Sequence, residues 1–92
     1  MTSQPVYILP KLQQLPGSLP LDGAVRLELQ EGIPLLRAST TVQRRITALV
    51  RKQQEKTLTP EETDELDRYE EMDDYLSFLN RIVRNQFQAQ QV

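Results

Sequence analysis

The sequence predicts an α+β protein: an N-terminal extended arm and β-hairpin, followed by an antiparallel α-helical hairpin with a long second helix. Three observations support this fold class. Five of the six prolines and all three glycines lie within residues 1–34, apolar and polar residues alternate over residues 24–30, and two helix-start signals follow. The 92 residues therefore divide into an arm-and-hairpin region at 1–38 and a helical-hairpin region at 39–92.

The N-terminal third has no room for a long helix, because prolines and glycines interrupt every stretch of it. Residues 6–9 are apolar and are followed by Pro10, which predicts a short strand or an extended arm. Residues 12–21 contain two Leu-Pro steps and predict an irregular connection. We expect order in this region to depend on a partner surface.

The clearest strand is predicted at residues 24–30, where three apolar residues alternate with polar ones at the period of a half-buried strand. Glu31 and Gly32 predict a turn, after which residues 33–37 return as a second strand. Because Pro34 cannot donate a ladder hydrogen bond, this second strand is expected at an edge or with a bulge. A lone hairpin is marginal in water, so it must pair or pack.

A first helix is predicted at residues 41–56. Thr40, followed three residues later by Gln43, resembles a capping box that starts such a helix. At helical spacing, apolar side chains share one face and basic side chains gather on the opposite face. The apolar face comprises Val42, Ile46, Leu49 and Val50, and the basic face comprises Arg44, Arg45, Arg51 and Lys52.

The strongest local signal in the chain starts a second helix. Thr59 is the predicted N-cap, Pro60 occupies the first helical position, and Glu62 closes the capping box. Nothing interrupts this helix before about Phe87, so it exceeds 25 residues. The short connection between the helices favours an antiparallel pair in which the first helix covers only the first half of the second.

The second helix carries an apolar stripe that widens from Tyr75 onward to an arc of about 180°. One intramolecular neighbour cannot cover so wide an arc, which predicts a protein interface with a second copy or another protein. The alternative is that the arc packs on the arm at residues 6–9. The predicted interface residues are Tyr69, Met72, Tyr75, Leu76, Phe78, Leu79, Ile82, Val83 and Phe87.

The composition argues against enzymatic chemistry and for assembly. The chain has no Cys and no His, which removes thiol nucleophiles, imidazole bases and nearly every zinc, haem or iron-sulfur site. Acidic pairs at helical spacing, such as Glu70 with Asp73, could bind a hard cation but more often form a solvated face. We therefore expect no catalytic residue, no metal and no cofactor. With 5% aromatic residues the core is small, so a homo-oligomer or a subunit is expected.

No apolar run approaches the roughly 20 residues that span a bilayer, and residues 1–5 lack the basic start and apolar stretch of a signal peptide. We expect a cytoplasmic protein that does not contact a membrane. Charge is split along the chain: residues 1–56 have a net charge of +4, and residues 57–92 have −6. This suggests a polyanion or an acidic protein as partner of the first part and a basic partner for the second. Attraction between copies, or ordinary solvated helix faces, would explain it equally well.

Residues 8–11, 19–28 and 32–37 resemble the swapped-hairpin DNA-binding domain of the AbrB and MazE families. In that domain an isoleucine-proline-basic step precedes a loop, a turn with glycine and aspartate, and two strands that end in an apolar-arginine pair. The resemblance implies a homodimer that binds DNA through its hairpins and a toxin protein through a C-terminal extension. The nucleic-acid contacts it implies are Lys11, Arg26 and Arg37, extended along the first helix by Arg44, Arg45, Arg51 and Lys52.

Residues 41–87 are also similar to small uncharacterised bacterial proteins, many of them cyanobacterial, that share an arginine-bearing helix and a Leu-Thr-Pro-Glu-Glu start of a second helix. Two hypotheses follow. The first is a non-enzymatic, antitoxin-like regulator that binds a toxin or nuclease through its C-terminal helix and DNA through its basic N-terminal half. The alternative is an adaptor or accessory subunit of a larger complex that binds no nucleic acid.

Overall fold

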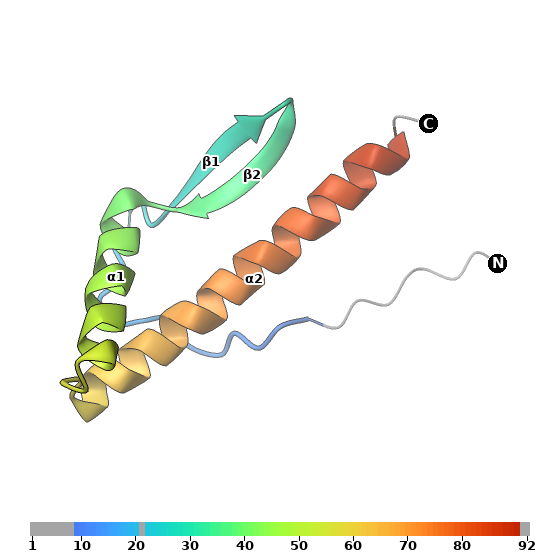
Figure 1. Ribbon diagram of the computed structural model, residues 1–92. Helices are drawn as coiled ribbons and strands as arrows, with labels where there is room; N and C mark the ends of the chain where they lie inside the picture. The colour runs from blue at the N-terminus through green and yellow to red at the C-terminus, as the bar shows by residue number, and fades with distance from the viewer. Residues whose placement is uncertain (1–8, 21, 91–92) are drawn as a thin grey trace.

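The computed structural model describes residues 9–20 and 22–90, and within them it confirms the α+β class. The elements in chain order are β1 (Val25–Gln30), β2 (Ile33–Ala38), α1 (Thr40–Gln54) and α2 (Pro60–Gln90) (Figure 1). The molecule is elongated, 52 × 29 × 25 Å, because the 31 residues of α2 form a rod of about 46 Å. Of the arm predicted at residues 6–9, only Leu9 lies within the described residues.

The two strands form an antiparallel hairpin with the predicted turn. Pairing runs from Val25 opposite Ala38 to Gln30 opposite Ile33. Glu31 and Gly32 connect the strands with φ angles of 54° and 81°, the two left-handed residues of a type I′ turn. Gly32 adopts this conformation without strain, and the turn fixes the register of the whole hairpin.

The outer edge of β2 lies against α2 and is hydrogen-bonded to the side chain of Asn80. The Leu36 N–H donates to Asn80 Oδ1 at 2.8 Å, and Asn80 Nδ2 donates to the Leu36 carbonyl at 2.9 Å. Both backbone groups of Leu36 therefore point away from β1. In an antiparallel pair the facing residue behaves likewise, so the backbone groups of Leu27 point to the outer edge of β1. Pro34 has the same outward-facing position on β2, where no N–H is required, as the edge prediction expected.

The alternating pattern of β1 correctly predicted a strand, but the expected burial of its apolar side was wrong, and no residue of β1 is buried. Val25, Leu27 and Leu29 are 39%, 66% and 72% exposed. The reason is the way in which the hairpin docks: α2 meets the edge of β2 and leaves this face of the sheet uncovered. The exposed apolar row is therefore a surface feature of the hairpin.

Helix α1 begins one residue earlier than predicted and has a different cap. Ser39, not Thr40, is the N-cap: its backbone is extended and its Oγ accepts from the Val42 N–H at 3.3 Å. Gln43 does not close a capping box, because its side chain donates to the Ala38 carbonyl at 2.8 Å. The helix also ends earlier than the predicted residue 56, since Lys56 is left-handed with φ of 58°.

The start of α2 confirms the predicted capping box. The Glu62 N–H donates to Thr59 Oγ1 and the Thr59 N–H donates to Glu62 Oε1, both at 3.1 Å. Pro60 occupies the first helical position. The helix then continues without a break to Gln90, slightly beyond the predicted end.

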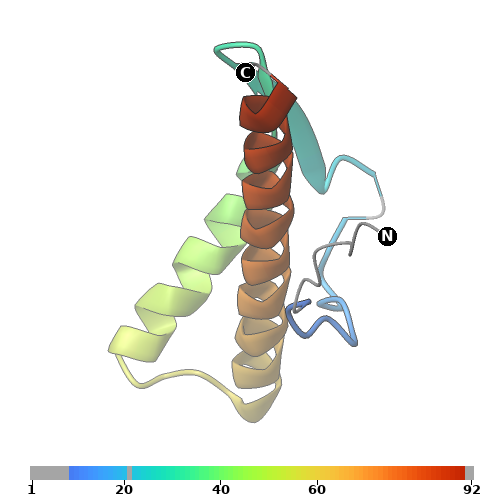
Figure 2. The ribbon, with the colours of Figure 1, turned by 90° about the vertical axis from the view of Figure 1, so that its right-hand side faces the viewer.

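The core lies between α1 and the first half of α2. Its buried members are Val42, Leu49, Leu66, Tyr69 and Met72, and partly buried residues pack around them. Two of these, Leu12 and Leu19, come from the N-terminal segment, which passes on the side of α2 opposite α1 (Figure 2). Helix α2 is thus enclosed between α1 and this segment, and the 1–38 and 39–92 regions share one core.

Candidate functional site

An open groove of about 760 Å³ lies between β2, α1 and α2. Its apolar lining includes Leu35 from β2, Ile46 from α1 and Leu76 from α2. Helix α2 also contributes three carboxylates, those of Glu70, Asp73 and Asp74. We call this feature the acidic groove. Asn80, which lies further along α2 than the core residues, holds β2 beside this helix and so forms one wall of the groove.

The three carboxylates of the acidic groove are exposed and have no ion pair with any other residue of the described chain. Their spacing of three and four residues places Glu70, Asp73 and Asp74 on one side of α2. The lining also includes Arg37, which is bound to Glu28, so a further cationic side chain in the groove would relieve the repulsion among the three carboxylates.

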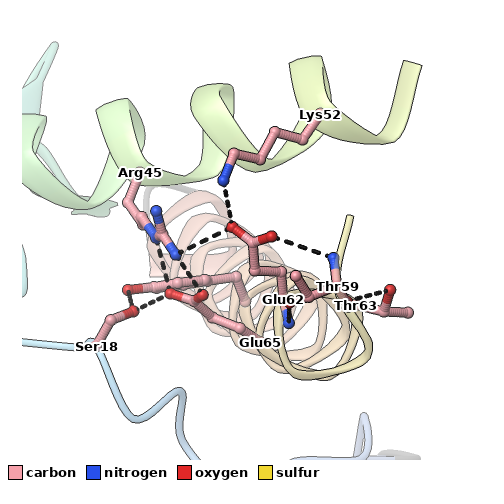
Figure 3. A network of polar contacts seen from close by, with 8 residues as sticks. Ser18, Arg45, Lys52, Thr59, Glu62, Thr63 and Glu65 are labelled. Carbon is pink, nitrogen blue, oxygen red and sulfur yellow. Dashed lines mark hydrogen bonds and ion pairs between the residues drawn. The ribbon is translucent and has the colours of Figure 1, made fainter. Parts of the chain in front are cut away.

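Two residues of the predicted basic face instead join α1 to α2 (Figure 3). Arg45 donates from Nε and Nη2 to the two carboxylate oxygens of Glu65, at 2.9 and 2.7 Å. Lys52 Nζ lies 2.6 Å from Glu62 Oε2. Hydrogen bonding by Arg45 lowers the pKa of Glu65, and hydrogen bonding by Lys52 lowers the pKa of Glu62. These cations therefore form part of the helix–helix contact.

The same network reaches the N-terminal segment. Ser18 Oγ donates to Glu65 Oε2 and lies 2.8 Å from the Tyr69 hydroxyl. Ser18 thus ties the loop at residues 16–19 to the buried face of α2 (Figure 3). No sequence pattern indicates this role for the serine, because it lies in an irregular segment far along the chain from Glu65.

The other predicted nucleic-acid contacts fall into two groups. Arg26 Nε and Arg37 Nε both contact the carboxylate of Glu28, at 2.8 and 3.0 Å, on one face of the hairpin. Lys11, Arg44 and Arg51 are exposed and have no ion pair with a described residue. Four of the seven predicted contacts are therefore already paired within the chain.

The predicted protein interface is also divided. Tyr69 and Met72 are 1% and 5% exposed and belong to the core, so a partner cannot reach them. Phe78 is buried as well, with its ring centroid 6.4 Å from that of Tyr75. The remaining predicted residues are half-buried or exposed: Tyr75, Leu76, Leu79, Ile82, Val83 and Phe87. Their role as an interface stays a prediction.

The Arg45–Glu65 pair predicts a dependence of stability on pH. Because the pKa of Glu65 is lower in the folded chain than its ordinary 4.5, the stabilisation is complete above pH 4.5 and is lost as the pH falls through the folded value. We expect the melting temperature to drop between pH 5 and pH 3. In Glu65→Gln the drop is smaller and the melting temperature at pH 7 is lower than in the wild type. Glu61→Gln, which removes an unpaired surface carboxylate, is the control and keeps the wild-type profile.

Within residues 9–20 and 22–90, no three acidic side chains converge to hold a metal ion, and no helix is long and apolar enough to cross a membrane. Comparison with known proteins finds no family model, curated protein or solved structure that matches this chain.

Proposed function

We propose that this chain is a non-enzymatic regulator that binds a partner protein, and that the acidic groove receives a basic, partly apolar segment of that partner. The observation that carries the proposal is the set of unpaired carboxylates at Glu70, Asp73 and Asp74 beside an apolar lining. Both an antitoxin-like regulator and an accessory subunit act in this way.

The lining favours a peptide segment over a nucleic acid. Phosphate groups are repelled by the three carboxylates, whereas Lys or Arg side chains are attracted to them. Leu35, Ile46 and Leu76 are each half-buried and gain further burial when an apolar side chain enters between β2 and α2. A segment with alternating basic and apolar residues satisfies both parts of the groove.

The test uses a fluorescent peptide of about 15 residues with leucines on one face of a helix and arginines on the adjoining face. A matched peptide has glutamate in place of every arginine. We expect the chain to bind only the basic peptide, with an affinity that falls as salt rises. Asp73→Lys with Asp74→Lys weakens this binding about tenfold or more. The control is Glu55→Lys with Glu61→Lys, which changes the net charge by the same amount near the connection between α1 and α2. We expect it to leave binding close to the wild type.

Amide chemical shifts locate the peptide. Binding in the acidic groove perturbs the amides of Leu35, Ile46 and Ser77, which lie on its three walls. Equal loss of affinity in the two double variants, or shift changes confined to other surfaces, would contradict the proposal.

A second candidate function, DNA binding, is supported by Arg44 and Arg51. These exposed residues are two helical turns apart on α1, so they share one face that no described side chain neutralises. If the chain is an antitoxin-like regulator with an operator, its affinity for that DNA falls steeply with salt, and Arg44→Glu with Arg51→Glu abolishes it. Arg81→Glu with Arg84→Glu, an equal charge change on α2, is the control. DNA binding retained by the α1 double variant would contradict a DNA contact through Arg44 and Arg51. A wild type that binds no DNA would favour the accessory-subunit alternative.

A further inference from the structure

The outer edge of β1 is open and apolar. The backbone groups of Val25, Leu27 and Leu29 point outward, and among the described residues β1 pairs only with β2. The side chains of the same three residues form the exposed apolar row. A strand edge of this kind is a template for pairing with another strand.

We propose that this edge pairs with the same edge of a second copy, antiparallel and with Leu27 facing Leu27 of the second copy across a twofold axis. The result is a continuous four-stranded sheet with the order β2, β1, β1, β2. In this register Val25 faces Leu29, and Arg26 faces Glu28, on both sides of the axis.

Backbone geometry fits this register. Each outward-pointing residue of one strand, Val25, Leu27 or Leu29, meets an outward-pointing residue of the other. Such facing residues exchange two N–H···O=C hydrogen bonds in an antiparallel ladder. The apolar side chains of the two strands then lie directly beside one another and remove each other from water.

Charge selects this register over its neighbours. Around Leu27 the strand has a cation on one side, Arg26, and an anion on the other, Glu28. Antiparallel pairing centred on Leu27 places these opposite charges face to face twice. Two neighbouring registers keep the same hydrogen-bonding pattern, one centred on Arg26 and the other on Glu28. The first places Arg26 opposite Arg26 of the second copy, and the other places Glu28 opposite Glu28, so like charges face each other in both. The strand is thus complementary to itself in one register only.

Nothing described blocks the approach of a second copy. Strand β2 lies between β1 and α2 (Figure 1), so the second copy arrives from the side away from α2. The acidic groove stays open in the dimer. This inference is therefore independent of the proposed function.

The test exploits the facing of Arg26 with Glu28. Arg26→Glu makes both residues acidic, and Glu28→Arg makes both basic, so each variant alone places like charges opposite each other in its own dimer. We expect each to weaken self-association about tenfold or more relative to the wild type, measured by sedimentation equilibrium at low salt. An equimolar mixture of the two variants restores opposite charges across the axis. It forms a heterodimer of near wild-type affinity, counted by native mass spectrometry.

Controls separate this result from a loss of folding and from other modes of association. Arg26 is exposed, Glu28 is half-buried, and Glu28 pairs with Arg26 and Arg37 on the surface of the hairpin. Because surface ion pairs contribute little to stability, circular dichroism of each variant should match the wild type. Leu27→Lys also abolishes self-association, whereas Leu15→Lys, at an exposed leucine outside the hairpin, does not. A monomeric wild type overturns the proposal. So does a mixture that fails to associate, or a dimer that is sensitive to Leu27→Lys but indifferent to the charge variants, which would indicate that hairpin faces stack.

Discussion

Leu49→Ala lowers the free energy of unfolding by about 2–5 kcal/mol. Leu49 is completely buried where α1 packs on α2, and the core around it has only four other buried members. Truncation removes apolar contacts and leaves a cavity between the two helices. Since small domains have a total stability of roughly 5–15 kcal/mol, this loss is a large share of the total. Urea unfolding followed by circular dichroism measures the change.

The control for this variant is Leu27→Ala, which removes the same atoms from a side chain that is 66% exposed. We expect its free energy of unfolding, measured at a concentration where the wild type is monomeric, to lie within about 0.5 kcal/mol of the wild type. If Leu49→Ala and Leu27→Ala had equal free energies of unfolding, the placement of the core between α1 and the first half of α2 would be wrong.

The features that could be predicted from the sequence are those with local causes. The capping box of Thr59 and Glu62 requires only residues within one turn, and it was found as predicted. The turn at Glu31-Gly32 and the edge position of Pro34 follow from the φ angles and donors of single residues. The end of α1 was missed by two residues, because a left-handed Lys56 has no sequence signal as clear as glycine.

The features that escaped prediction depend on how the elements dock. A strand with the pattern of β1 is usually buried on its apolar side, but Asn80 attaches this hairpin by the edge of β2. An asparagine in the middle of a helix has no local signal for that role. Leu12 and Leu19 likewise lie in an irregular segment without periodicity, so their contacts with the core could not be read from spacing.

Part of the candidate site could be predicted from the sequence. Arg45 and Lys52 are seven residues apart, and Glu62 and Glu65 occupy the start of the next helix. An antiparallel helical hairpin brings these two sets together, so the ion pairs follow from the predicted topology once opposite charges on facing helices are compared. The acidic groove could not be predicted from the sequence. By spacing alone, Glu70, Asp73 and Asp74 form an ordinary solvated helix face, and only the position of β2 beside them makes a groove.

Asn80→Ala detaches the hairpin from α2. The substitution removes both hydrogen bonds to the backbone of Leu36 and leaves its N–H and carbonyl with no protein partner in a half-buried contact, at a cost of about 1–3 kcal/mol. Because Asn80 lies eight residues beyond Met72, the last member of the core on α2, we expect α1 and the first half of α2 to stay folded. Hydrogen exchange measured by mass spectrometry should therefore show faster exchange across β1 and β2, with little change at residues 42–50.

The same variant connects the fold to the proposed function. The acidic groove has β2 as one wall, so a hairpin that is no longer held beside α2 cannot enclose a bound segment, and affinity for the basic peptide falls although every carboxylate remains. Asn85→Ala, at an exposed asparagine of the same helix, preserves both exchange and affinity. Slow exchange in the hairpin of Asn80→Ala would mean that apolar contacts between β2 and α2 suffice to hold it. Unchanged peptide affinity in a variant with rapid hairpin exchange would mean that the peptide binds α2 alone and that β2 takes no part in recognition.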